Sequence, residues 1–463
     1  MKKLVLLLVG VVICSAPLCA GEFLRNDTGE AASDQLESQP HVPVLIIPGI
    51  LGSMLVDATT SHDKLLWPGT VMFGGDIEPL RLPPTGKGSL GFDIRATGLV
   101  GIVEPLSTLE LFNKSSLARL VPSWLSDWIP DTVRLLSYYG GLITAFQSAE
   151  YVLDVDLFTF PYDWRRDLLE VSILLASKIA DILDQTGAEE VDIVAHSMGG
   201  LLARAYVNTT DAPAIRKLIM MGTPSHGSPD AFVALHSELG NGRLLLEDKN
   251  AQELSTNWPS VFQLLPTPKY FELYGHIFDD RFGGIHEGAL TGGSGAAAWQ
   301  RTYLENPDSS LAEVNEHLLT TAETYSAWEF HEHIGSTLRF TGELVIIAGS
   351  GTSTVGTIVK DDSTDHSWDG VPINGDGTVP LLSVTRLESS GAIDIYHTTA
   401  SHEGMLSDTA VRQLLPILLS GDASNISEVL LDVSRSLRQE LSISDGREDE
   451  AFSVSKRVAS PLQ

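Results

Sequence analysis

The sequence predicts a fold of the α/β class, in which helices flank a mostly parallel central sheet. Several short apolar runs are rich in β-branched residues, and such runs are typical of strands buried on both faces of a parallel sheet. Glycine or proline follows several of these runs, and a segment with apolar residues at helical spacing separates two of them. This alternation of strand and helix favours a parallel α/β sheet.

The start of the chain has the form of a targeting segment. A charged beginning, Met1 to Lys3, is followed by an apolar run from Leu4 to Pro17, which is typical of a secretory signal peptide. We therefore predict a signal peptide over residues 1–20 and an exported protein that is secreted, periplasmic or associated with the cell envelope. A form lipidated on Cys19 is not expected, because Leu18 is larger than the residue that should precede a lipidated cysteine.

The folded part is expected to begin near residue 42, after a polar leader over residues 21–41. Val44 to Ile47 is predicted to form the first buried strand. Apolar residues at helical spacing from Val171 to Leu183 predict a helix that Gly187 ends. The remaining expected strands are Val191–Val194, Lys217–Met221, Leu344–Ala348 and Ile393–Tyr396, with helices over Leu201–Val207 and Met405–Leu419.

One domain over residues 42–420 is predicted, with two insertions, the second of which does not alternate strand with helix. These insertions, around residues 67–138 and 225–340, are interpreted as cap or lid regions, because long insertions are often functional in such folds. Residues 421–463 are expected to form one amphipathic helix followed by a polar tail. In the second insertion, Trp258, Val261, Phe262, Leu264 and Leu265 could line an acyl groove or belong to the core.

Composition and charge exclude several classes of protein. The chain has 30 Lys and Arg residues against 60 Asp and Glu residues, a net charge of −30. Such a charge argues against nucleic-acid binding and against anionic lipid surfaces. Cys14 and Cys19 are the only cysteines, so a chain cut after residue 20 has no disulfide and no thiol nucleophile.

The strongest chemical signal lies between a predicted strand and a predicted helix. The pentapeptide is Ala195-His-Ser-Met-Gly199. A serine on a tight strand-to-helix turn stands clear of the carboxyl edge of the sheet, and this nucleophile elbow needs small residues two positions away on either side. Ala195 and Gly199 meet that need. Ser197 is therefore the predicted nucleophile of an α/β-hydrolase fold.

A serine hydroxyl needs a base and an orienting acid, and in this fold the chain order is serine, acid, histidine. Asp376, in a glycine-containing turn, and His402, in a loop between a predicted strand and a helix, fit that order. His397 is the alternative base. His331 and His333 flank a glutamate, but we interpret that segment as surface or lid and expect neither a metal nor a cofactor.

Catalysis by such a serine also needs donors that face the oxyanion of the tetrahedral intermediate. The backbone N–H of Met198, directly after the nucleophile, is one predicted donor. The turn after the first strand should supply the second, with Ile50 preferred and Leu51 as the alternative.

Several separate blocks of the sequence resemble the lecithin:cholesterol acyltransferase family, which includes lysosomal phospholipase A2 and phospholipid:diacylglycerol acyltransferases. Pro43 to Ser53 is similar to the family's oxyanion turn, and Pro161-Tyr-Asp-Trp-Arg165 to its Pro-Tyr-Asp-Trp-Arg block. The elbow, Gly222-Thr-Pro224, Gly375 to Pro380 and the His402 loop follow in the family's order. The resemblance covers about residues 42–415.

The resemblance implies an α/β-hydrolase core that cleaves an acyl ester of a lipid and passes the acyl group to an alcohol or to water. It assigns the triad to Ser197, Asp376 and His402, and the oxyanion hole to Ile50 and Met198. Phospholipid or acylglycerol at an interface is the expected partner, which leaves room for transient contact with a membrane surface. Tyr162 to Arg165 is interpreted as structural.

Two other functions remain open from the sequence. One is a secreted lipase or carboxylesterase that never uses an alcohol acceptor, since water always competes for an acyl-enzyme. The other is a non-catalytic lipid-binding protein of the cell envelope built on a hydrolase scaffold.

Overall fold

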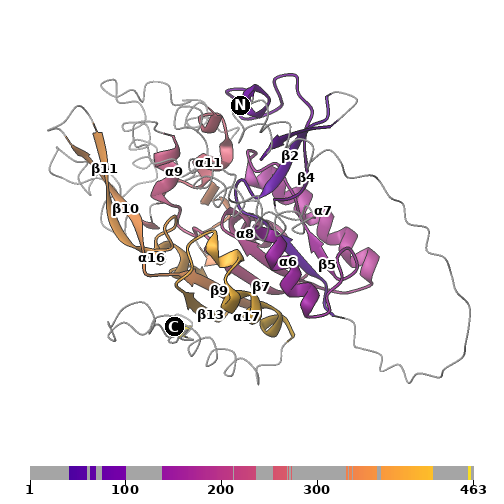
Figure 1. Cartoon of the computed structure of the whole chain (residues 1–463). Coiled ribbons are helices and arrows are strands. Elements are labelled where there is room, and N and C mark those ends of the chain that lie inside the picture. Colours follow the sequence, from indigo (N-terminus) through magenta and orange to yellow (C-terminus); the bar gives the residue numbers. More distant parts are fainter. Residues whose placement is uncertain are drawn as a thin grey trace, which may run out of the picture. The chain divides into compact units, whose positions relative to one another are not determined.

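The computed structural model describes a core that begins at His41 (Figure 1). The described residues are 41–59, 63–68, 76–100, 138–211, 213–235, 254–267, 269–270, 273, 330–331, 333–335, 337–361, 367–420 and 457–459. The predicted signal peptide, nearly all of the polar leader and the predicted amphipathic helix after residue 420 lie outside these residues.

A seven-stranded sheet forms the centre of this core, in the order β14-β13-β9-β7-β6-β1-β5. Six of its strands pair in parallel. They are β1 (Val44–Ile47), β5 (Leu157–Thr159), β6 (Val191–His196), β7 (Ile215–Met221), β9 (Glu343–Gly349) and β13 (Ile393–Thr398). The predicted α/β class with a mostly parallel sheet is confirmed.

The first strand shows why these runs are apolar throughout. Val44 and Ile46 belong to one buried cluster, whereas Leu45 and Ile47 belong to the other. Successive side chains of a strand point to opposite faces, so the two clusters lie on the two faces of the sheet. A strand covered on both faces needs apolar residues at every position.

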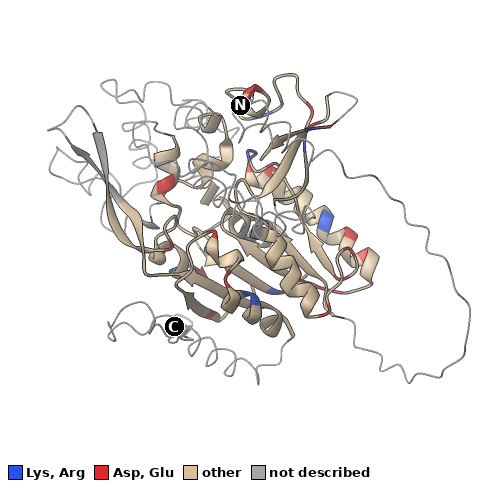
Figure 2. Ribbon diagram, in the orientation of Figure 1, with Lys and Arg blue, Asp and Glu red and all other residues tan. Residues whose placement is uncertain are grey.

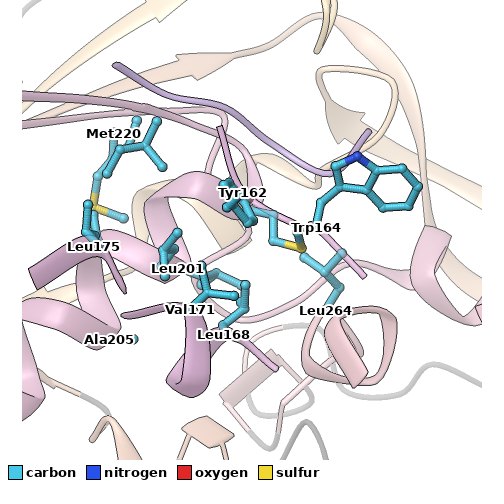
Figure 3. Packing of buried hydrophobic residues seen from close by; sticks show 14 of the residues in the cluster. Tyr162, Trp164, Leu168, Val171, Leu175, Leu201, Ala205, Met220 and Leu264 are labelled. Carbon is cyan, nitrogen blue, oxygen red and sulfur yellow. The ribbon is translucent and has the colours of Figure 1, made fainter. Parts of the chain in front are cut away.

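Helices cover both faces. The cluster with Leu45 includes residues of α7 (Leu168–Thr186) and α8 (Met198–Thr209), and Figure 3 shows Leu175 and Leu201 packed near Met220 of the sheet. The cluster with Val44 includes residues of α6 (Tyr138–Ser148) and α17 (Thr409–Ser420), two helices that lie side by side in Figure 1.

The residues at its two ends explain where the long helix α7 begins and ends. The Asp167 side chain accepts a hydrogen bond from Leu169 N at 2.9 Å, which caps the first turn. Gly187 ends the helix with a left-handed φ of 70°, as its position predicted.

A second, smaller sheet is formed by segments before and within the first predicted insertion, and the sequence did not indicate its strands. β2 (Ser53–Asp57), β3 (Lys64–Trp67) and β4 (Ile94–Leu99) form a three-stranded antiparallel sheet in the order β3-β2-β4. These strands belong to a sheet separate from the seven-stranded one. β4 includes Arg95, Thr97 and Gly98 and is mostly only half-buried, so it has no continuous apolar run. A 3-10 helix, η1 (Glu78–Leu80), lies between β3 and β4.

The described part of the second insertion consists of short elements. They are α9 (Pro229–Ala234), α11 (Pro259–Gln263) and β8 (Thr337–Leu338), which pairs with β12 (Glu388–Ser389). The five apolar residues for which a groove or a core position was open all lie in the main core cluster: Trp258, Val261, Phe262, Leu264 and Leu265. The core interpretation therefore describes them better.

The C-terminal part differs from the predicted pattern in three places. An antiparallel hairpin, β10 (Thr352–Asp361) and β11 (Ser367–Gly375), follows β9, and α16 (Leu381–Thr385) comes next. The single helix predicted over Met405–Leu419 is wrong in extent, because a 3-10 turn, η6 (Gly404–Leu406), precedes α17. Asp408 accepts a hydrogen bond from Val411 N at 2.9 Å and so starts a new helix.

The predicted polar tail also contributes to the sheet, because β14 (Arg457–Ala459) pairs antiparallel with β13. Over the described residues, charged positions are scattered along the ribbon, and Lys and Arg positions gather in no stripe (Figure 2). No helix among these residues combines the length and the apolar character that crossing a membrane requires.

Candidate active site

Ser197 lies at the junction of β6 and α8, where the backbone makes a strained turn. Its φ of 54° and ψ of −126° are unusual for a residue with a side chain. The turn brings α8 against the first strand: a Cβ added to Gly199 would lie 2.5 Å from Pro48 O. Strand, turn and helix therefore have the geometry that a nucleophile elbow requires.

The structure brings the three predicted triad side chains together from distant segments. His402 Nε2 lies 2.8 Å from Ser197 Oγ, and His402 Nδ1 lies 2.8 Å from Asp376 Oδ2. All three residues are buried. Asp376 directly follows β11, and His402 lies between β13 and η6.

Backbone groups hold the aspartate in place. Its Oδ1 accepts hydrogen bonds from Thr378 N at 3.0 Å and Val379 N at 2.6 Å. The Asp376 carbonyl accepts a further bond from His402 N at 2.8 Å. The loop that carries the histidine is thus tied to the turn that carries the carboxylate, which leaves Oδ2 for the imidazole.

The electrostatic surroundings favour a protonated His402. Burial lowers its pKa, but the charge of Asp376 and the hydrogen bond to it more than compensate, and together they raise the pKa to about 9. When neutral, an imidazole with this partner is a strong base that can take up the proton of Ser197, as a general base must.

The predicted oxyanion donors belong to the residue after the serine and to the turn after β1, where a Cβ added to Gly49 would lie 2.8 Å from Ser197 Cβ. Met198 is the first residue of α8, where backbone N–H groups have no partner within the helix. Ile50 lies in a turn after β1 that Gly52 N closes onto Gly49 O at 3.1 Å. Leu51 in this turn has a φ of 62°, a value at which glycine is usual, so the turn holds a strained conformation.

Three aromatic side chains hold that turn by its carbonyl groups. Tyr162 Oη donates to Pro48 O at 2.9 Å, Trp67 Nε1 to Leu51 O at 2.7 Å, and Trp164 Nε1 to Ser53 O at 3.0 Å. These bonds give a physical reason for the Tyr162 to Arg165 block, which the sequence indicated only as structural. No local sequence pattern indicated that Trp67 would donate a hydrogen bond to this turn.

The other histidines singled out in the sequence lie elsewhere. His397, the alternative base, is in β13, and His402, not His397, contacts Ser197. His331 is buried and its Nε2 lies 3.2 Å from Gln263 O, while His333 is exposed. Within the described ranges, no group of three or more His, Cys, Asp or Glu residues could hold a metal ion.

The parallel sheet and the strained serine at its carboxyl edge place the chain in the class of α/β-hydrolases. The family model described as "Lecithin:cholesterol acyltransferase" matches residues 90–341. The chain belongs to this family, and it is an α/β-hydrolase akin to lipid acyltransferases and phospholipases.

Two Arabidopsis thaliana proteins illustrate the relationship. "Lecithin-cholesterol acyltransferase-like 4" is 24% identical over 238 residues, which cover 50% of this chain and 42% of the relative. The match therefore spans less than half of that relative's length. "Phospholipase A(1) LCAT3" is 21% identical over 446 residues, covering 86% of this chain and 93% of the relative.

Solved structures with a similar arrangement include the Tle4–Tli4 complex, with a TM-score of 0.47, 15% identity, and coverage of 82% of this chain and 98% of the other. The lipase BlEst2 of Bacillus licheniformis in its propeptide form has a TM-score of 0.35 and 12% identity, covering 83% of this chain and 52% of the other.

Proposed function

We propose that the protein is a serine-dependent O-acyltransferase or phospholipase that acts on acyl esters of lipids through an acyl-enzyme on Ser197. The hydrogen-bonded series from Ser197 through His402 to Asp376 is the observation that carries the proposal. Family membership supports a lipid ester as substrate, and one relative is named as a phospholipase A(1). The apolar leader supports export.

The first half of the proposed reaction forms the acyl-enzyme. Ser197 Oγ attacks the ester carbonyl carbon while His402 Nε2 takes the hydroxyl proton, and Asp376 stabilises the resulting imidazolium. The negative charge passes to the carbonyl oxygen, where the N–H groups of Ile50 and Met198 are proposed to bind it. When the intermediate collapses, the ester C–O bond breaks and His402 gives its proton to the leaving alcohol.

The second half reverses these steps with a new acceptor. His402 removes a proton from water or from an alcohol, whose oxygen attacks the acyl carbon and displaces Ser197 Oγ, which regains the proton from His402. Water yields a free fatty acid, and an alcohol yields a new ester. The same residues serve both outcomes, so the acceptor decides between phospholipase and acyltransferase activity.

The test uses the purified protein with a soluble short-chain ester and then with phosphatidylcholine vesicles, with and without a long-chain alcohol or sterol. A new ester would establish acyl transfer, whereas free fatty acid alone would establish a hydrolase that uses water. Ser197→Ala should lower kcat by roughly 10⁵-fold or more without lowering the melting temperature.

Ser177→Ala is the matched control, because Ser177 is exposed on α7 and its loss should leave turnover unchanged. A fluorophosphonate probe should label wild type and not Ser197→Ala. Substantial ester cleavage by Ser197→Ala would overturn the assignment, and absence of labelling in wild type would favour a non-catalytic scaffold.

A further inference from the structure

A histidine that the proposed mechanism does not use lies directly beside the nucleophile. His196 is the last residue of β6 and is 6% exposed. Its Nδ1 lies 3.2 Å from Tyr139 Oη, and its Nε2 lies 3.0 Å from His402 O. Tyr139, on α6, also accepts a hydrogen bond from Gly49 N at 2.9 Å.

The chemistry of these groups fixes the direction of every bond. A carbonyl oxygen only accepts, so His196 Nε2 carries a proton and donates it to His402 O. In a neutral imidazole the other nitrogen is then an acceptor, and the Tyr139 hydroxyl donates to His196 Nδ1. That leaves the hydroxyl oxygen to accept from Gly49 N–H. Proton donation runs in one direction, from Gly49 through Tyr139 and His196 to His402.

Both side chains keep the ionisation state that this order needs. Burial, followed by the nearby His402, lowers the pKa of His196 to about 3, so the ring stays neutral at ordinary pH. Burial also raises the pKa of Tyr139, which keeps its proton. A neutral ring is important here, because the rings of His196 and His402 are 4.9 Å apart and a second cation would oppose protonation of His402.

The two ends of this series belong to the two parts of the proposed machinery. Gly49 begins the turn that carries Ile50, and His402 is the proposed base. These two segments lie far apart in the sequence. One tyrosine and one histidine nevertheless join them through three hydrogen bonds. Rates of such reactions are sensitive to displacements of about 1 Å in positioning groups.

We propose that Tyr139 and His196 are positioning residues that hold the oxyanion turn and the backbone of His402 in a fixed relation across the nucleophile. This inference rests on the proposed function. It assigns a role in catalysis to the residue before the nucleophile and to a helix on the far side of the sheet from α8, neither of which the elbow motif requires.

The test compares substitutions that keep or remove single hydrogen bonds. Tyr139→Phe removes one oxygen and both of its bonds. His196→Asn can replace only the nitrogen near Tyr139, whereas His196→Gln can extend an amide donor towards His402 O. We expect Tyr139→Phe and His196→Asn to lower kcat on a soluble ester by about 10- to 100-fold with KM nearly unchanged, and His196→Gln to recover most of it.

Tyr206→Phe is the matched control. Tyr206 is a buried tyrosine of α8 that bonds to the Ala214 backbone, so its variant loses a buried hydroxyl without touching the series. It should lose stability without losing kcat. Melting temperature, kcat, KM and the rate of fluorophosphonate labelling are measured for every variant.

Wild-type kcat in Tyr139→Phe would overturn the inference, as would equal loss in His196→Asn and His196→Gln. Because Tyr139→Phe removes a single atom, it keeps the inference testable if the histidine variants do not fold. Failure of the proposed function is separate and shows in wild type, as turnover that does not depend on Ser197 or as absence of labelling.

Discussion

At the scale of single residues, the surroundings of each histidine decide its charge. His402 and His196 are both buried, and the centroids of their rings are 4.9 Å apart. His402 is hydrogen-bonded to a carboxylate, which outweighs the effect of burial and raises the pKa of His402 to about 9. His196 is hydrogen-bonded only to a hydroxyl and a carbonyl, so burial lowers its pKa to about 3. One site thus holds one imidazole suited to carry a proton and one suited to stay neutral.

The pKa of His402 predicts the acid side of the activity profile. Only the neutral imidazole can accept the Ser197 proton, so kcat/KM should rise with pH until about pH 9. Asp376→Asn removes the charge that raises this pKa. We expect the acid limb to move to lower pH and kcat to fall by roughly 10⁴-fold, measured with a soluble ester and by the pH dependence of fluorophosphonate labelling.

Asp181→Asn, on the exposed side of α7, is the control for the loss of one negative charge. It should change neither the pH of the acid limb nor kcat. An acid limb that stays at the same pH in Asp376→Asn would contradict the proposed pairing of Asp376 with His402.

At the scale of elements, the site depends on how closely α8 approaches β1. An added Cβ at Gly199 would lie 2.5 Å from Pro48 O and 2.6 Å from Ile47 O, both backbone atoms. Backbone cannot rotate away as a side chain can, so only glycine permits this contact. The elbow and the oxyanion turn are therefore one packed unit.

Gly199→Ala should accordingly push α8 away from the oxyanion turn. We expect a loss of about 1–3 kcal/mol in the free energy of unfolding together with a fall in kcat of at least about tenfold, measured by urea denaturation and by turnover of a soluble ester.

Gly98→Ala is the matched control, because its added Cβ would meet only Met54 Cε, the end of a flexible side chain that can move away, and its site lies in β4, outside the triad. Equal stability and activity of Gly199→Ala and wild type would show that the contact can relax.

At the scale of the whole molecule, several histidines are buried without charge. Burial lowers the pKa of His226 to about 4, that of His196 to about 3 and that of His331 well below its usual value. His226 and His331 make hydrogen bonds to the carbonyls of Arg386 and Gln263. The bond from His226 links the start of the second insertion to the end of α16, and the bond from His331 links two segments within the insertion.

These histidines predict acid sensitivity with a definite sign. Below pH 6.5 an unfolded histidine takes up a proton, whereas the folded one stays neutral until its lower pKa is reached. The unfolded state then binds more protons, so the free energy of unfolding falls as pH falls from about 6.5 towards 4. His402 adds nothing in this window, because it is protonated in both states.

We expect the melting temperature of wild type to fall between pH 7.5 and pH 4.5, and the fall to be smaller by a few degrees in His331→Gln and in His226→Gln. Glutamine can donate to the same carbonyls without titrating. His333→Gln, at an exposed position, is the control and should fall as wild type does. Identical falls in all variants would mean that these two histidines do not govern acid unfolding.

Sequence patterns indicated β1, β6, β7, β9 and β13 of the central sheet, though not β5 or β14, and they indicated the position of the elbow. Both depend on local patterns: apolar runs where a strand is covered on both faces, and small residues around a serine where strand meets helix. It also indicated Asp376 and His402, because the chain order of such triads is constant in this fold. The family resemblance added the block around Trp164.

The remaining features depend on how the whole chain packs. The half-buried strand β4 has no apolar run to mark it, and the hairpin that carries Asp376 lies outside the parallel sheet. Trp67, Tyr139 and Tyr162 reach the oxyanion turn from positions 16 to 114 residues away. A hydrogen bond between such distant residues depends on how the whole chain packs, and no local period in the sequence records it.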